Sequence, residues 1–242
     1  MKRTELPVRP HSGLVKNRRS MAASSRLLST YLVLVGASLI ASALIYRFFP
    51  GSRGLMIAED SLVENCSALF YISTSLLSLL SALSLRSRVG KLYALSCVAL
   101  LGFLDELSFG ERIFSLSMPT LSGKKIDAVH DLVDVAKIQI LRHTSGHSEI
   151  VVLALGGLAG LFVLALLKWN AEIRIFLVPR LKNISVIFVL LFAVCGLIAT
   201  LLDLNFDHKE YLVVLEEVLE MDAALCLLFL CFSLKRSAQT AP

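Results

Sequence analysis

Carboxylate side chains gather in three short segments of the sequence, and each segment adjoins an apolar run. The segment AEDSLVEN holds Glu59, Asp60 and Glu64, LDELSFGERIF spans 104–114, and YLVVLEEVLEMD spans 211–222. An ionised carboxylate in hydrocarbon costs on the order of several kcal/mol, so such groups turn toward a bundle interior or a water-filled cavity. The three segments therefore predict a polar site within a membrane-embedded bundle.

The second of these segments has the residue types of an active site. Asp105, Ser108 and Arg112 share one face of a helix because they are spaced i, i+3 and i+7, and Glu106 lies beside them. Arg112 is placed to neutralise part of the carboxylate charge. Ser108 is a candidate nucleophile, although the sequence shows no base for it. We take Glu106, Ser108, Arg112 and the more distant His130 as the catalytic candidates.

The third segment places Glu216 and Glu220 at i and i+4 on one helix face, with Glu217 beside them. The rest of that helix is apolar, which puts the three glutamates several residues below the outer membrane boundary. The second and third segments belong to spans of opposite direction, yet their acids reach a similar depth. We therefore predict one shared pocket that opens outward. The other pocket candidates are Glu59, Asp60, Glu64, Asp105, Asp131 and Glu217.

An amphipathic segment at 125–141 carries a polar stripe with one histidine. Asp127, His130, Asp131 and Asp134 are spaced i, i+3, i+4 and i+7, opposite an apolar face. We predict a helix that lies on the outer membrane surface or caps the bundle. Its polar stripe fits a plain solvated face and a part of the site equally well.

Carboxylates together with one imidazole are the ligand types of a divalent metal site. Their spacing matches none of the HExxH, ExxH or CxxC metal motifs. The same side chains could instead pair with Arg53, Arg112 or Lys209, or line a solvated vestibule. The candidate metal ligands are Glu106, His130, Glu216 and Glu220.

Membrane-spanning helices must position these groups. Of the 242 residues, 56% are hydrophobic and 18% are charged, and the mean hydropathy is +0.74, which is more apolar than a soluble domain. Uncharged runs of 18 residues or more occupy 27–46, 65–85, 150–167 and 183–202, and each is about long enough to cross a bilayer. Two shorter runs, 92–104 and 223–234, are long enough to cross a bilayer only if their helices also include residues of the second and third acidic segments.

We therefore predict an all-α, polytopic integral membrane bundle of about six transmembrane helices plus the amphipathic helix. The spans are expected near 27–49, 65–85, 92–114, 149–168, 183–204 and 211–234, in a membrane domain that covers 27–234. Residues 1–26 are expected to form a disordered basic tail, and 235–242 a second tail. The serines of the second span and the five cysteines are expected to be packing residues.

Charge asymmetry predicts the orientation. With six spans, 16 of the 24 Lys and Arg lie on the side of both termini. The positive-inside rule then places both termini in the cytoplasm and the protein in the cell membrane. The outer half holds 17 of the 19 acids and four of the five histidines. The basic N-terminal tail suits anionic lipid headgroups of the bilayer better than nucleic acid, because it adjoins a span.

Taken together, the acidic segments resemble the pattern of a family of uncharacterised bacterial polytopic membrane proteins. In that family an acidic segment precedes an early span, a Glu-x-Ser-aromatic-Gly-x-Arg motif closes a later one, a histidine follows in a loop, and a Glu-Glu-x-x-Glu helix comes near the C-terminus. The matching positions are Glu59, Asp60, Glu64, Glu106, Ser108, Phe109, Gly110, Arg112, His130, Glu216, Glu217 and Glu220.

The family pattern has Trp, Gln and Asn where this chain has Phe109, Glu111 and Asp131, so this site is more acidic. The resemblance covers about 55–234. It implies a common site and names no activity.

Two functions of different classes fit these residues. The first is a membrane-embedded, metal-dependent hydrolase or transferase that acts on a lipid or lipid-linked substrate and activates water at a carboxylate–imidazole site. The second is a cation- or proton-coupled transporter or binding protein that uses the acids as an ion site. A non-catalytic scaffold subunit is a third, but it leaves the buried acids without a role. The sequence favours the enzyme, because the inner halves of the third and sixth spans offer no polar path.

Overall fold

The computed structural model describes residues 12–58, 61–85, 89–108, 120–121, 124–125, 183–203 and 209–239. Its elements are α1 (Ser12–Phe48), η1 (Pro50–Ser52), α2 (Gly54–Ile57), α3 (Leu62–Ser84), α4 (Gly90–Glu106), β1 (Thr120–Leu121), β2 (Lys124–Lys125), α9 (Ile184–Asp203) and α10 (Glu210–Gln239). β1 and β2 form an antiparallel pair of two residues each. The remaining regular structure in the described residues is helical, as the sequence predicts.

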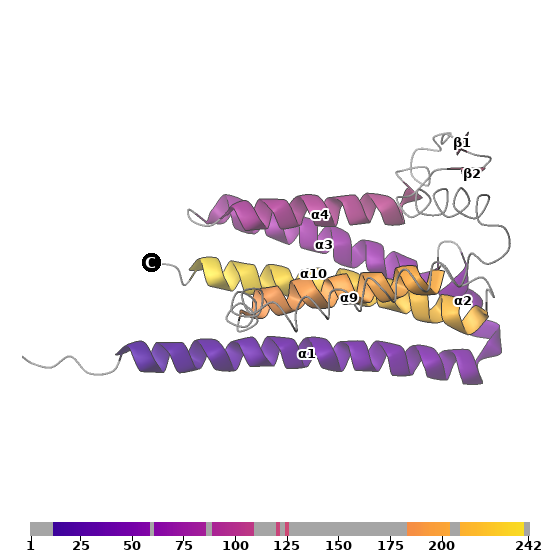
Figure 1. The fold of residues 1–242 in the computed structure, drawn as a ribbon, viewed down its shortest axis with the longest axis horizontal. Helices are drawn as coiled ribbons and strands as arrows, with labels where there is room; N and C mark the ends of the chain where they lie inside the picture. Colours follow the sequence, from indigo (N-terminus) through magenta and orange to yellow (C-terminus); the bar gives the residue numbers. More distant parts are fainter. Residues whose placement is uncertain are drawn as a thin grey trace, which may run out of the picture.

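The five long helices lie side by side, with α10 at the centre (Figure 1). α10 packs against α9, α3, α1 and α4. In Figure 1 it lies between the α3–α4 pair and α1. Its residues 222–227 are all buried, so the middle of this helix has neighbours on every side.

α3 has its polar side chains inside and its leucines outside. It buries Ser67, Thr74, Ser75, Ser78 and Ser81, whereas its exposed side chains include Leu69, Leu76, Leu80 and Leu83. This distribution is the reverse of a water-soluble protein and is typical of helices in lipid, where small and hydroxyl residues let the backbones approach. A surface of exposed leucines is stable only in an apolar environment.

Three segments are long and apolar enough to cross a membrane: Ser25–Phe48, Pro50–Ser84 and Ile184–Leu202. The second of these runs over residues 59–60, which lie outside the described residues. The three segments overlap the spans expected near 27–49, 65–85 and 183–204, so the helical membrane fold is confirmed at this level. α4 and α10 occupy the regions expected near 92–114 and 211–234. The expected span near 149–168 and the amphipathic helix at 125–141 lie outside the described residues.

Several helix boundaries differ from the expected ones. α1 begins at Ser12, inside the tail expected to be disordered, because that stretch contains no proline and is rich in helix formers that extend the following span. α10 likewise continues to Gln239, past the expected end at 234. α4 stops at Glu106 instead of continuing to 114, which makes it about 25 Å long.

α3 and α4 are antiparallel and meet through hydroxyls and a glycine. The Ser75 hydroxyl donates to the Ser96 carbonyl at 3.0 Å, and the Ser96 hydroxyl donates to the Ser75 carbonyl at 3.0 Å. Closer to the end of α4, the Tyr71 ring lies over Gly102, where an added Cβ would come within 2.6–2.9 Å of three ring carbons. The pair can approach this closely because position 102 carries no side chain.

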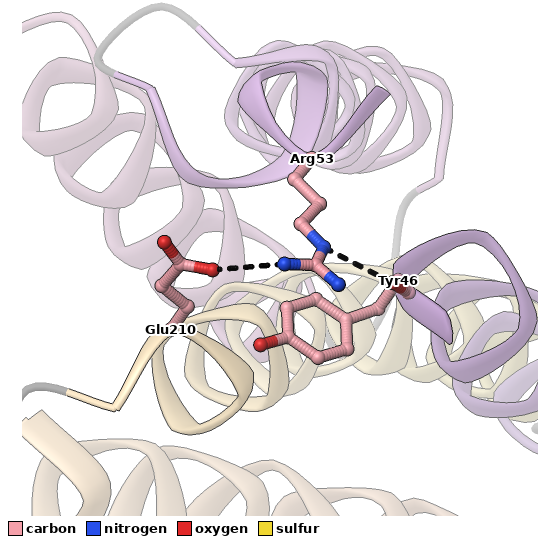
Figure 2. Close-up of polar contacts among 3 residues, drawn as sticks. All are labelled: Tyr46, Arg53 and Glu210. Carbon is pink, nitrogen blue, oxygen red and sulfur yellow. Dashed lines mark hydrogen bonds and ion pairs between the residues drawn. The ribbon is translucent and has the colours of Figure 1, made fainter. Parts of the chain in front are cut away.

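An arginine joins the end of α1 to the start of α10 (Figure 2). Arg53 Nη1 donates to Glu210 Oε2 at 3.3 Å, and Arg53 Nε donates to the Tyr46 carbonyl at 3.1 Å. The guanidinium also lies 4.3 Å from the centre of the Tyr46 ring. Arg53 therefore uses Glu210 as its carboxylate partner, which makes it part of the helix connection.

We expect Gly102→Ala to lower the melting temperature of the full-length protein in detergent. The Tyr71 ring must move out of the way, which costs about 1–3 kcal/mol. Gly196→Ala is the matched control, since a Cβ at that helical position meets nothing within 4 Å and alanine is the better helix former. Equal melting temperatures for the two variants would contradict the close α3–α4 contact.

Arg53→Ala is expected to destabilise the protein more than Glu210→Gln does. The first substitution removes the ring contact, the bond to a carbonyl and the ion pair, together about 1–2 kcal/mol. The second removes only an ion pair whose Glu210 side chain is 61% exposed, for which about 1 kcal/mol is an upper value. Thermal unfolding of both variants measures the difference, and a larger effect of Glu210→Gln would refute this ranking.

Candidate acidic site

Apart from Asp222, the described carboxylates of the three acidic segments lie at one end of the bundle, which we call the acidic end. It is formed where α3 and α10 begin and α4 finishes, and it contains Glu64, Asp105, Glu106, Glu216, Glu217 and Glu220. Glu59, Asp60, Arg112, His130 and Asp131 were also expected there, but they lie outside the described residues.

Glu64 is fixed by the start of α3. Ser61 is the N-cap residue, and its hydroxyl accepts a hydrogen bond from the Glu64 backbone N–H at 3.1 Å. The Asn65 amide donates to the Ser61 carbonyl at 2.8 Å. An acidic side chain in the first turn is also favoured by the helix dipole. The sequence Ser-x-x-Glu thus places a carboxylate at this end of the helix.

Glu106 is the centre of the acidic end. It is the last residue of α4 and is half-buried. Its carboxylate interacts electrostatically with those of Glu220, Glu64, Glu217 and Asp105, the first being the strongest. α3, α4 and α10 therefore each contribute acids to one place, as the sequence pattern predicts for the second and third segments.

Two features of the surroundings of Glu106 act against a negative charge on its carboxylate. Its carboxylate neighbours repel it, and the C-terminus of α4 carries the negative end of the helix dipole. A proton or cation that binds among these groups relieves this repulsion. Glu216 lies one helical turn before Glu220 on α10 and is half-buried as well.

Tyr71 belongs to the acidic end, although sequence reasoning did not identify it. Its phenol interacts electrostatically with Glu106, Glu220 and Asp105. Tyr71 lies seven residues after Glu64 on α3, so both are on the same helix face. This spacing could have linked Tyr71 to the acidic site, but spacing within one helix does not show which neighbouring helix the two side chains face. The contact with Gly102 of α4 determines where the ring lies.

Ser108 adopts a left-handed backbone conformation, with φ of 48°. It follows Leu107, the C-cap of α4, whose N–H donates to the Phe103 and Asp105 carbonyls. A left-handed residue at this position commonly ends a helix, and glycine is preferred there. A serine at such an angle costs about 1–2 kcal/mol, and strained residues of this kind are frequent at functional sites.

The metal site proposed from the sequence is not assembled by its described members. Among the residues that the structure describes, no group of three His, Cys, Asp or Glu side chains is arranged to hold a metal ion. Glu106, Glu216 and Glu220 alone therefore do not supply a ligand set. His130, the fourth candidate ligand, lies outside the described residues.

Asp222 is a buried acid that the sequence pattern did not distinguish from the other acids of the third segment. Asp222 lies two residues after Glu220, which turns it to a different face of α10. It is 0% exposed, and the Ser38 hydroxyl of α1 donates to its carboxylate. Among the described residues, Asp222 is thus separate from the carboxylate cluster of the acidic end.

We expect Ser108→Gly to keep or raise the melting temperature and Ser108→Val to lower it, because only glycine adopts the left-handed conformation without strain. The predicted difference between the two variants is about 1–2 kcal/mol. Thermal unfolding in detergent measures it. If valine is tolerated as well as glycine, Ser108 does not have the left-handed conformation.

Comparisons of the chain with protein-family models, with curated proteins and with solved structures find no match. The resemblance described above therefore stays a prediction.

Proposed function

We propose that the acidic end is an outward-facing proton-binding site of an ion-coupled transporter. The observation that carries this proposal is the shared position of Glu64, Asp105, Glu106, Glu217 and Glu220, which come from three helices. Carboxylates that influence one another in this way can take up protons from the solvent, because each added positive charge relieves the repulsion among them.

Buried hydroxyls along α3 support transport rather than a closed pocket. Ser67, Tyr71, Thr74, Ser78 and Ser81 repeat at helical spacing, so they form one stripe that begins beside the acidic end. Thr74 and Ser78 are 0% exposed. Their hydroxyl oxygens have no hydrogen-bond partner among the described residues, although the Cys231 thiol lies beside Ser78. Such groups can bind a passing ion or water.

The polar stripe on α3 bears on the choice between an enzyme and a transporter. The enzyme was favoured because the inner halves of the third and sixth spans lack polar groups. The structure adds the hydroxyls of α3 and the carboxylate of Asp222 at greater depth. Intramembrane polar groups at such depth mark ion pathways. The proposed orientation, with both termini in the cytoplasm, makes the acidic end external and leaves the basic N-terminal tail beside anionic lipid.

A membrane-embedded, metal-dependent hydrolase or transferase is the second candidate. It is favoured by the strained backbone of Ser108 directly after Glu106. A lipid or lipid-linked substrate would reach the end of α4 from the bilayer. In this alternative, Arg112 and His130 would complete the site, and a divalent ion held there would supply the activated water.

The test is ion flux in liposomes that contain the full-length protein and a trapped pH-sensitive dye. Addition of Na⁺, K⁺, Mg²⁺ or Ca²⁺ outside is expected to change the internal pH for at least one of these cations. Glu106→Gln keeps the side-chain shape but removes the central charge. We expect this variant to slow the change by at least about tenfold, equivalent to about 1.4 kcal/mol.

Glu210→Gln is the matched control, because it removes the same charge from the same end of the bundle but affects only the Arg53 ion pair. It is expected to keep the wild-type rate. Absence of flux with every cation, or equal rates for Glu106→Gln and wild type, would overturn the proposal. A stoichiometric divalent ion, detected by mass spectrometry without flux and lost in Glu106→Gln and His130→Ala, would favour the enzyme.

A further inference from the structure

Asp222 is a solitary carboxylate at the contact of α1, α9 and α10. Its side chain is 0% exposed. Both carboxylate oxygens lie 2.9 Å from the Ser38 hydroxyl of α1. The Tyr31 hydroxyl donates its hydrogen bond to the Asp222 backbone carbonyl at 3.3 Å, and not to the Asp222 carboxylate. The cluster of acids described above plays no part in these contacts.

The hydrogen bonds around Ser38 do not satisfy an ionised Asp222. The Ser38 hydroxyl has one proton, yet three acceptors lie within its reach: the two carboxylate oxygens and the Val35 carbonyl at 2.8 Å. An ionised carboxylate needs several donors when it is buried. Among the described residues it would have at most one, and would share that one with a backbone carbonyl.

A protonated Asp222 gives every polar hydrogen of this group an acceptor in the same geometry. The acid hydroxyl donates to Ser38 Oγ, and the Ser38 hydroxyl donates in turn to the Val35 carbonyl, so each polar hydrogen has one acceptor. Hydrogen bonds arranged in such a chain strengthen one another. The observed distances of 2.9 Å and 2.8 Å fit both bonds.

The described surroundings of Asp222 supply no positive charge. Residues 27–46 of α1 and 184–202 of α9 contain no lysine, arginine or histidine. The titratable groups near Asp222 are Tyr31 on α1, Cys195 on α9 and Cys226 on α10, all of which are uncharged when protonated. No basic side chain among the described residues is bonded to Asp222. Burial of an unpaired anion in this place is strongly unfavourable.

The site is deep in the bundle. Ser38 lies near the middle of the Ser25–Phe48 span, about 15 Å along the helix from Phe48. A bilayer core is about 30 Å thick, so the Ser38–Asp222 pair lies near its midplane. A proton bound there is shielded from both aqueous sides.

We propose that Asp222 is a proton-binding site of the bundle interior, occupied as a neutral carboxylic acid that bonds to Ser38 and thereby joins α1 to α10. Loss of the proton leaves a charge with too few donors at this contact, so proton release is coupled to separation of α1 from α10 or to entry of water or a cation. This inference goes beyond the function of the acidic end and does not depend on it.

Infrared spectroscopy of the full-length protein in lipid bilayers tests the proposal, because a carboxylic acid and a carboxylate absorb at different frequencies. At neutral pH the wild type is expected to show a carboxylic-acid C=O band that Asp222→Asn lacks. Ser38→Ala retains Asp222 and should keep the band but shift its frequency, since the acid hydroxyl loses its acceptor. Glu210→Gln, a change on the exposed surface, should leave the band unaltered.

Equal spectra of wild type and Asp222→Asn in the carboxylic-acid region would overturn the proposal, as would an unshifted band in Ser38→Ala. Asparagine can donate to Ser38 as the acid does, so Asp222→Asn is also expected to keep the wild-type melting temperature. If that variant fails to fold, the band shift in Ser38→Ala still decides the matter. The readout is protonation and not ion flux, so its failure is distinct from failure of the transport proposal.

Discussion

α10 can exist in an apolar environment only if other helices surround it. The helix carries Glu216, Glu217, Glu220 and Asp222 within its length, and an exposed carboxylate in hydrocarbon is strongly unfavourable. α1, α3, α4 and α9 all pack against it, and residues 222–227 in its middle are completely covered. The outer helices can therefore present leucine to lipid, because the polar groups of the chain are gathered around this central helix.

The packing that encloses α10 follows the physics of lipid. Since hydrocarbon surrounds both the assembled and the separated helices, leucines gain little by turning inward, and close approach of backbones stabilises the bundle instead. Ser75 and Ser96 bond reciprocally across α3 and α4, and Gly102 makes room for the Tyr71 ring. That ring is among the acids, so the same close contact that stabilises the helix pair also shapes the acidic end.

The two acidic regions stabilise their carboxylates by different means. At the acidic end, Glu106 lies among like charges at a helix C-terminus, where binding of a positive charge is favourable. At the α1–α10 contact, the neighbours of Asp222 are hydroxyl groups, which carry no charge. Binding of one proton, which neutralises the carboxylate, is favourable there.

The membrane class, the helical fold and the meeting of Glu106 with Glu220 were all predictable from the sequence. Each depends on a local rule: apolar run length, helix periodicity, or the cost of a charge beside hydrocarbon. The end of α4 at Glu106 and the role of Tyr71 were not predictable, because they depend on Ser108 and on Gly102 of a neighbouring helix. Asp222 shows the same limit most clearly. Its spacing from Glu220 turns it to another face of α10, but only the tertiary structure decides that Ser38, 184 residues away in the chain, covers that face, because helix–helix contacts depend on packing in three dimensions.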